Sequence, residues 1–469
     1  MGWTLDNSRN AIIYSLSVIL LHILLFPEYI MSIPILIIGV VIIMFFFLSF
    51  NYYLNKWREV KEIERKIFLH SFLYRLIAVV GMYILTYIYD PLNLPMEFGA
   101  ADAWNYHASG AIVSDAIQND RSITQALSGF WKNENDYGFS IYIGLIYSLF
   151  GKNILIIKAI NALWGSLTAV RIYQICKDIF DEESARISSI LCMIFPSLLW
   201  FSSMMLKETI LIFLLINITY YIIQISKSPE KWLNYAFGLL ISLIPIYYFR
   251  VFLIPLIMFC MLLQLMFYQN KSKKRRFVFY FASISIMAIT FYMINSFNML
   301  QGFIKVFEGS SGTFNAELSN SAIQRGINYK IAVVAPFLVF GAIITPFPSL
   351  IHFNDEQIGI YMHYQNEIIR NIMYFFLFIA IYRLYKNFNK LTIFISSFAL
   401  GYIAILAFSG VSFQDRFQVI ALPFLLILMG YGIKNYTQNL SKKWGAYLFI
   451  ITIAILSWNI FKLSIRGLV

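Results

Sequence analysis

Residues 31–50 read MSIPILIIGVVIIMFFFLSF, a run without a single charged side chain. A helix needs about 20 mostly apolar residues to cross the hydrocarbon core of a bilayer. The segment that follows, 55–66 (NKWREVKEIERK), is densely charged. An apolar run that ends in a basic segment is typical of a transmembrane helix whose end lies in water.

The rest of the chain repeats this pattern. Its 469 residues are 59% hydrophobic and 13% charged, and the mean hydropathy is +0.70. Soluble domains carry about 25% charged residues, so the composition indicates an integral membrane protein. The candidate spans are 11–27, 31–50, 67–89, 154–175, 184–204, 208–226, 233–249, 251–269, 277–295, 371–387, 392–409, 417–434 and 445–463. We therefore expect one all-α, polytopic membrane domain of about 13 transmembrane helices.

The basic residues cluster in short loops between these spans. The clusters are 55–66, Lys177/Arg186, Lys227/Lys231, 271–276, Arg383/Lys386/Lys390 and Lys434/Lys442/Lys443. The positive-inside rule places such loops in the cytoplasm, so residues 90–153 and 296–330 should face outward. This distribution also argues against nucleic acid as the partner that explains the net charge of +12. Lys462 and Arg466 would lie outside and do not follow the rule.

Several segments do not fit as spans. Residues 139–150 are too short, and 331–348 are interrupted by prolines, while 349–370 are too polar to cross. We expect these segments to be interfacial or re-entrant pieces packed against protein. In the outer loop 91–138, the helical spacing of apolar residues in 102–118 and 121–131 predicts short amphipathic helices on the outer face.

The outer loop contains the stretch 97–107, EFGAADAWNYH. A carboxylate beside lipid is expensive to desolvate, so Asp102 is a candidate catalytic base, although a solvated acidic loop would also explain it. Other polar side chains fall at the same predicted depth: Tyr106, His107, Lys158, Ser202, Ser203, Lys207, Glu208, Arg250, His352, Asp355, Glu356, His363, Glu367 and Arg416. Each of these residues also has an explanation without a functional site: a lysine at a helix end can snorkel to the interface, and Lys207 and Glu208 can form a local ion pair. Their convergence on one side favours a site.

Transfer from a lipid-phosphate donor is the chemistry that fits these residue types. Asp102 would accept the proton of an acceptor hydroxyl. Arg250, Arg416, Lys207 and Lys158 would neutralise the phosphate leaving group. Glu208, Tyr106, His107, His352, Asp355 and His363 would support the site. We predict no metal ligand and no cofactor; the sequence offers no support for a divalent metal.

Several motifs resemble one family. They are DAWNYHA (102–108), GFSIYIGLIYSLFG (138–151), KAINALWGSLTAVRIYQICKDIF (158–180), ARISSILCMIFPSLLWFSSMMLKET (185–209), TPFPSLIHF (345–353) and DRFQVIALPFLLILMGYGI (415–433). The chain looks like the polyprenyl-phosphate-sugar-dependent glycosyltransferases of the GT-C fold, which include protein O-mannosyltransferases, the lipid A aminoarabinose transferase and bacterial exopolysaccharide members.

This resemblance covers about 67–435, the GT-C-like core. It implies a base or acceptor-orienting role for the first-loop aspartate, which maps to Asp102. Two features depart from the family: the acid pair of metal-dependent relatives is absent beside Asp102, the nearest acid being Glu97, and two extra helices (1–66) precede the core. Residues 436–469 add a C-terminal helix.

The leading expectation is thus a glycosyltransferase with a polyprenyl-phosphate-linked sugar donor and a glycan or lipid-linked acceptor. It would lie in a bacterial inner or plasma membrane, among membrane lipids, with its site facing the periplasm or exterior. A repeat-unit polymerase of surface polysaccharide remains an alternative. A lipid-linked saccharide transporter fits less well, because paired broken helices with mid-bilayer charges are not evident.

Overall fold

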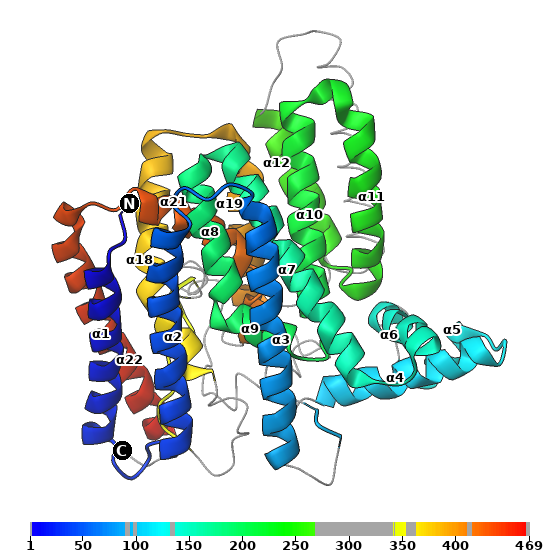
Figure 1. Ribbon diagram of the computed structural model, residues 1–469, viewed down its shortest axis with the longest axis horizontal. Helices are drawn as coiled ribbons and strands as arrows, with labels where there is room; N and C mark the ends of the chain where they lie inside the picture. The colour runs from blue at the N-terminus through cyan, green and yellow to red at the C-terminus, as the bar shows by residue number, and fades with distance from the viewer. Residues whose placement is uncertain are drawn as a thin grey trace, which may run out of the picture.

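The computed structural model describes residues 2–89, 94–96, 101–131, 137–267, 341, 343–352, 363–409 and 415–465. These residues form a bundle of long helices (Figure 1), and the one β contact among them is an isolated bridge between Ile30 and Ile351. Nine described helices are long and apolar enough to cross a membrane, or ten if one bent pair counts as a span. The expected all-α polytopic fold is confirmed.

The α-helices, in chain order, are α1 (Leu5–Leu25), α2 (Ile33–Lys56), α3 (Ile63–Tyr89), α4 (Ala101–Gln118), α5 (Ile123–Ser128), α6 (Tyr137–Phe150), α7 (Ile154–Ile179), α8 (Glu182–Ile194), α9 (Pro196–Ser202), α10 (Glu208–Lys227), α11 (Trp232–Phe249), α12 (Leu253–Phe267), α18 (Tyr364–Lys386), α19 (Ile393–Ser409), α20 (Asp415–Gln418), α21 (Leu422–Lys434) and α22 (Ser441–Ile465).

Three of the predicted spans next to candidate site residues differ from the helices in the structure. The span 184–204 is broken at Pro196 into α8 and α9, which meet at an angle of 51°, because proline cannot continue the backbone hydrogen bonding of a helix. The span 417–434 begins only at Leu422, after the short α20. The span 371–387 begins earlier, at Tyr364, because the polar residues of its first turns are buried against other polar groups. The predicted span 277–295 lies outside the described residues.

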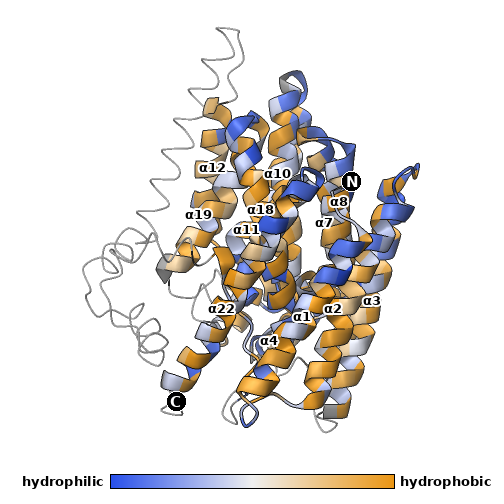
Figure 2. Ribbon diagram, turned by 90° about the vertical axis from the view of Figure 1, so that its left-hand side faces the viewer, coloured by the Kyte–Doolittle hydropathy of each residue, from blue (hydrophilic) through white to orange (hydrophobic). Residues whose placement is uncertain are grey.

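The helices differ in how deeply they are buried. Over the 18 most apolar consecutive residues of each helix, 72% of α10 and 67% of α18 are buried inside the protein. The same share is 28% in each of α3, α11 and α22. The exposed surfaces of these outer helices are apolar along most of their length (Figure 2), as lipid contact requires. Thus α10 and α18 are inner helices of the bundle, as are the shorter α8 and α21, most of whose residues are buried.

The basic loops meet at one end of the bundle. Arg186 donates to the backbone oxygens of Trp57 and, at 3.5 Å, Val60, which joins α8 to the connection between α2 and α3. Asp181 pairs with Lys434 at 2.6 Å, and so ties the start of α8 to the end of α21. All of these residues lie at the ends of predicted spans, so the loops predicted to share one side of the membrane do meet.

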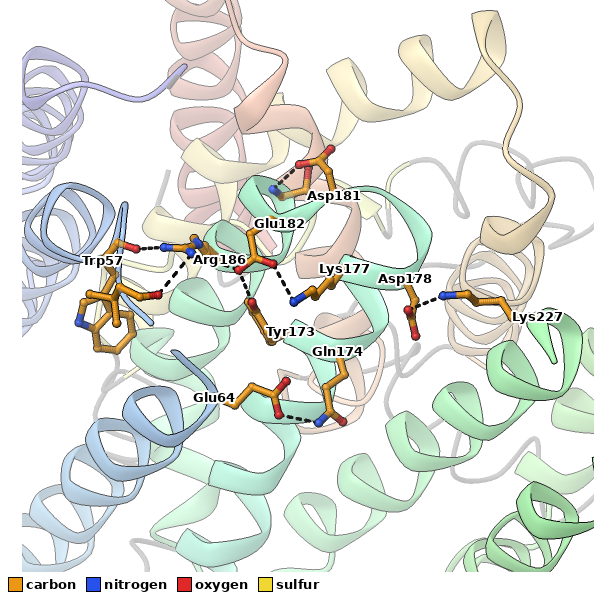
Figure 3. A network of polar contacts seen from close by, with 12 residues as sticks. Trp57, Glu64, Tyr173, Gln174, Lys177, Asp178, Asp181, Glu182, Arg186 and Lys227 are labelled. Carbon is orange, nitrogen blue, oxygen red and sulfur yellow. Dashed lines mark hydrogen bonds and ion pairs between the residues drawn. The ribbon is translucent and has the colours of Figure 1, made fainter. Parts of the chain in front are cut away.

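A denser part of this polar end surrounds the end of α7 (Figure 3). Asp178 pairs with Lys227 at 2.5 Å, and Glu182 pairs with Lys177 at 3.0 Å. Gln174 donates to Glu64 at 2.8 Å. These contacts tie α7 to α3, α8 and α10, so they fix the register of the central helices at this end.

The opposite end carries α4, which in Figure 1 runs out sideways from the bundle, with α5 and α6 beside it. This confirms the helices expected at 102–118 and 121–131. The 14-residue α6 packs along α4 so closely that a Cβ on Gly144 would lie 2.3 Å from Val113 Cγ1. Gly151 then turns the chain into α7 with φ +82, a conformation that favours glycine.

Candidate functional site

Arg416 joins two carboxylates at the end of the bundle where α4 lies. Its Nη1 donates to Asp102 Oδ2, near the start of α4, and its Nε donates to Glu208 Oε1 at 2.8 Å, at the start of α10. The two carboxylates are 106 positions apart in sequence (208 minus 102). A guanidinium can do this because its planar group presents several donors in different directions.

Glu208 is the buried centre of this group. Its side chain has no exposed surface, and the same Oε1 also lies 3.4 Å from Arg250 Nη2. Arg250 follows the last residue of α11, is 9% exposed, and lies over the ring of Phe417 at 5.1 Å. A buried carboxylate is tolerable only when cations and hydrogen bonds compensate it, and two arginines do so here.

The electrostatics of Arg416 follow from this arrangement. Burial opposes its charge and by itself lowers its pKa, but the carboxylates of Glu208 and Asp102 outweigh burial and raise the pKa of Arg416 above its ordinary value. Arg416 therefore stays a cation at every physiological pH. We refer to Asp102, Glu208, Arg250 and Arg416 as the arginine–carboxylate cluster.

Buried atoms in this cluster retain capacity for a ligand. Glu208 Oε2 and Arg250 Nη1 are both buried and make no hydrogen bond within the described part of the chain. Asp102 is the most exposed member, with 45% of its side chain accessible, and Arg416 retains 26%. The cluster is thus accessible from the side of α4 and closed on the side of α10.

Lys207 and Tyr106 lie beside the cluster. Lys207 immediately precedes α10 and is 7% exposed, and its ammonium group lies over the ring of Tyr106 at 5.7 Å. Tyr106 packs in turn on Phe139 of α6 at 4.9 Å and on Trp131. The local Lys207–Glu208 pair considered from the sequence does not explain Glu208, whose ion-pair partners in the described part of the chain are the two arginines.

Lys158 and His107 support neighbouring segments. The fully buried Lys158 donates from Nζ to the backbone oxygen of Pro95 at 3.4 Å, in the segment before α4. His107 Nδ1 lies 2.8 Å from the hydroxyl of Tyr147 on α6. Burial and then the charge of Lys152 lower the pKa of His107, so the ring is neutral near pH 7.

A second polar group adjoins the first through α20. Asp415, the neighbour of Arg416, lies 3.2 Å from Arg370 of α18 and 3.7 Å from His363. The ring of His363 packs edge-on against Trp200 of α9 at 4.8 Å. Burial is the largest effect on His363 and lowers its pKa, while Asp415 acts in the opposite direction.

The late outer segment is only partly described. His352 lies in an extended stretch, where its backbone N–H donates to the backbone oxygen of Tyr29 at 2.6 Å. Asp355 and Glu356 lie outside the described residues. Glu367 is in the first turn of α18. Residues 345–350 form no helix, as the prolines predict, whereas 364–370, which were expected to be interfacial or re-entrant, belong to the first turns of α18.

Ser202 and Ser203 serve the backbone of the turn before α10. Their hydroxyls donate to Leu199 at 2.8 Å and Trp200 at 2.7 Å. Asn161 of α7 donates to Met204 at 2.9 Å and so holds the same turn. These bonds fix the approach of the chain to Lys207 and Glu208.

The sequence pattern missed Asp415, Arg370 and Asn161. Asp415 is part of the DRFQ motif, and its position next to the candidate Arg416 could have indicated that it belongs to the site. Arg370 was in a stretch expected to be interfacial or re-entrant, and Asn161 was one of many amides inside a span. The chemistry of the assembled site is that of anion binding beside a carboxylate, because Arg250 and Arg416 contact the carboxylates and Lys207 immediately precedes Glu208.

Comparison with known proteins agrees with this chemistry. A family model described as dolichyl-phosphate-mannose-protein mannosyltransferase matches residues 138–294. No curated protein matches the chain. The matched region contains Lys158, Lys207, Glu208 and Arg250 and stops short of Asp102 and Arg416. The match supports the resemblance to GT-C glycosyltransferases and indicates that this membrane protein is a glycosyltransferase.

Proposed function

We propose that the protein transfers a sugar from a polyprenyl-phosphate donor to a hydroxyl of a glycan or lipid-linked acceptor at the outer membrane face. The observation that carries this proposal is the arginine–carboxylate cluster, in which Arg416 lies between Asp102 and the buried Glu208. The family match supports a lipid-phosphate sugar as the donor class.

The phosphate of the donor would bind Arg250 and Arg416, with Lys207 beside them. Arg250 Nη1 has no hydrogen-bond partner among the described residues, and Arg416 can exchange its contact with the half-exposed Asp102 for a phosphate oxygen. Glu208 is fully buried and would hold both guanidinium groups in place during this exchange. Bidentate binding of a phosphate is the role for which arginine is better suited than lysine.

In the transfer step, the acceptor oxygen forms a bond to the anomeric carbon while the bond from that carbon to the phosphate oxygen breaks. The proton of the acceptor hydroxyl passes to Asp102, and the lipid phosphate leaves as an anion beside the arginines. Attack opposite the leaving group inverts the anomeric centre. The position of Asp102 beside Arg416 would bring acceptor and donor together.

The test is Asp102→Asn, with Asp115→Asn as the matched control. Asparagine keeps the size of the side chain but cannot take the proton, so transfer should fall at least about 100-fold. Asp115 lies on the same helix and pairs with Lys152 at 2.7 Å at an exposed surface, so its variant should keep wild-type activity. Transfer would be measured with a labelled polyprenyl-phosphate sugar and purified protein.

Two outcomes would contradict the proposal. If Asp102→Asn keeps more than about a tenth of the activity, Asp102 is not the base. If the wild-type protein joins pyrophosphate-linked repeat units but does not use a monophosphate-linked sugar, it is a polymerase.

A further inference from the structure

Arg75 is a buried cation in the middle of α3, one of the candidate spans. Its side chain is 1% exposed. Its hydrogen bonds to oxygen go to neutral groups, and the thiol of Cys192 also contacts the guanidinium. A charged group at this depth is costly and is by default a sign of function.

The acceptors of Arg75 are the backbone carbonyls of the break between α8 and α9. In a continuous helix the carbonyl of Cys192 would accept from the N–H of residue 196, but residue 196 is proline and has no N–H. Arg75 Nη2 donates to this carbonyl at 3.0 Å, and Nη1 lies 3.4 Å from the carbonyl of Met193. In lipid a freed backbone group must find a partner inside the protein.

A residue of the same helix and a neighbouring helix hold the guanidinium in this position. Nη1 also donates to the hydroxyl of Ser71, one turn earlier on α3. On the other side, Gly165 of α7 leaves the room that the side chain needs, because a Cβ there would lie 2.3 Å from Arg75 Nε. The side chain of Arg75 thus lies between α7 and the break that separates α8 from α9.

The break determines where α9 leads the chain. The seven residues of α9 run from Pro196 toward the turn that carries Lys207 and Glu208. Thr209 donates to the backbone oxygen of Phe201 at 3.0 Å, which locks the end of α9 to the start of α10. A small cavity lined by Arg75, Leu198, Phe201 and Thr209 lies between α3, α9 and α10.

We infer that Arg75 is a positioning residue, which holds the broken helix α8–α9 so that Lys207 and Glu208 meet the phosphate of the donor. This inference rests on the proposed function for its effect on transfer. It makes a second, independent statement about the fold: the side chain of Arg75 replaces the backbone donor that Pro196 lacks.

The statement about the fold is tested by thermal unfolding of four proteins: wild type, Arg75→Met, Pro196→Ala and the double variant. Arg75→Met should lower Tm because it leaves the carbonyls of Cys192 and Met193 without a donor. In the Pro196→Ala background residue 196 has an N–H, so the same change should lower Tm by less than half as much. If Arg75→Met lowers Tm equally in the wild-type and the Pro196→Ala backgrounds, the inference is overturned.

The effect on transfer is tested by kinetics of Arg75→Lys and Gly165→Ala. Lysine has a single ammonium and cannot reach both carbonyls, and the added methyl group displaces the guanidinium. Both should raise the KM for the donor about 10-fold or more and leave the KM for the acceptor unchanged. Simple destabilisation would reduce the amount of active protein without changing either KM. Arg171→Lys is the control, since Arg171 contacts Gln174 and Tyr220 away from the break.

The outcomes separate this inference from the proposed function. An active wild-type protein whose Arg75→Lys and Gly165→Ala variants keep the donor KM would overturn the positioning role alone. A wild-type protein without transfer activity would overturn the positioning role together with the proposed function. The unfolding cycle decides in either case whether Arg75 compensates for Pro196.

Discussion

Arg416 shows how single residues make this site. Its Nε and Nη1 contact carboxylates from two different helices, and its neighbour Asp415 faces a third helix through Arg370. The short α20 therefore connects two polar groups that would otherwise be separate. Removing one partner of such a buried group leaves the others uncompensated, which typically costs about 3–5 kcal/mol.

Lysine should be a poor substitute for the arginines of the cluster. With one ammonium group, Arg416→Lys cannot hold Asp102 and Glu208 in the present geometry, and Arg250→Lys loses the planar group that lies over Phe417. Each variant should weaken binding of a polyprenyl phosphate about 10-fold or more, measured by calorimetry on purified protein. Arg383→Lys, at the other end of α18, should bind normally. Unchanged affinity in both cluster variants would remove the arginines from the phosphate site.

His107 predicts a pH dependence of stability. Burial and the charge of Lys152 lower its pKa in the folded protein, so protonation favours the unfolded chain. The stability that the neutral His107 ring contributes is present above the ordinary histidine pKa of about 6.5. It is lost as the pH falls from there toward the lower pKa that His107 has in the folded protein. His107→Gln should therefore show a smaller fall in Tm between pH 7 and pH 5 than wild type. His70→Gln is the control, and an unchanged pH profile in His107→Gln would contradict the assignment.

All four residues of the cluster were candidates from the sequence, but their pairing was not. Asp102, Arg250, Arg416 and Lys207 were predicted at one face because they follow or precede apolar spans. That Glu208 would face both arginines depends on how α10, α11 and α20 meet, which the apolar pattern does not specify. Arg75 was overlooked because a lone arginine in an apolar run has the plain explanation that it snorkels to the interface.

At the scale of elements, proline and buried polar residues account for the differences from the predicted spans. Pro196 interrupted an apolar run that composition alone read as one helix, because hydropathy does not register a missing N–H. The polar start of α18 was expected to be an interfacial or re-entrant piece, but it is helical, and its side chains bond inside the protein: Asn371 donates to Ile344 at 2.7 Å and Arg370 to Gln418 at 2.7 Å. Hydropathy predicts lipid contact, and these groups contact protein.

The pairing of α4 with α6 predicts that Asp102 depends on a glycine. Gly144→Ala would place a methyl group 2.3 Å from Val113 Cγ1, and overpacking of this kind costs about 1–3 kcal/mol. Because the displaced helix carries Asp102, sugar transfer should fall more steeply than the amount of folded protein. Gly81→Ala on α3, where a Cβ would meet nothing within 4 Å, should leave transfer unchanged. Equal activity in the two variants would show that α4 tolerates the shift.

Over the whole molecule, the separation of charge along the bundle is the main indication of orientation. The loops with Lys177, Arg186, Lys227 and Lys434 meet at one end, and the arginine–carboxylate cluster lies at the other. A transporter would need two broken helices in corresponding halves of the chain. Among the described residues there is one broken helix, formed by α8 and α9. A transferase therefore remains a better account of the architecture than a transporter.

This orientation predicts which positions react with a membrane-impermeant thiol reagent in intact cells. Asn119→Cys, at the exposed position just after α4, and Asp355→Cys should be labelled from outside, whereas Glu230→Cys, between α10 and α11, should be labelled only after the membrane is opened. The native Cys176, Cys192 and Cys260 are buried, so the background should be low, and the unmodified protein measures it. The reason is the positive-inside rule, which holds the end with Lys227 and Lys434 in the cytoplasm. If Asn119→Cys is labelled only in opened cells, the site faces the cytoplasm, and an outer-face transfer reaction is excluded.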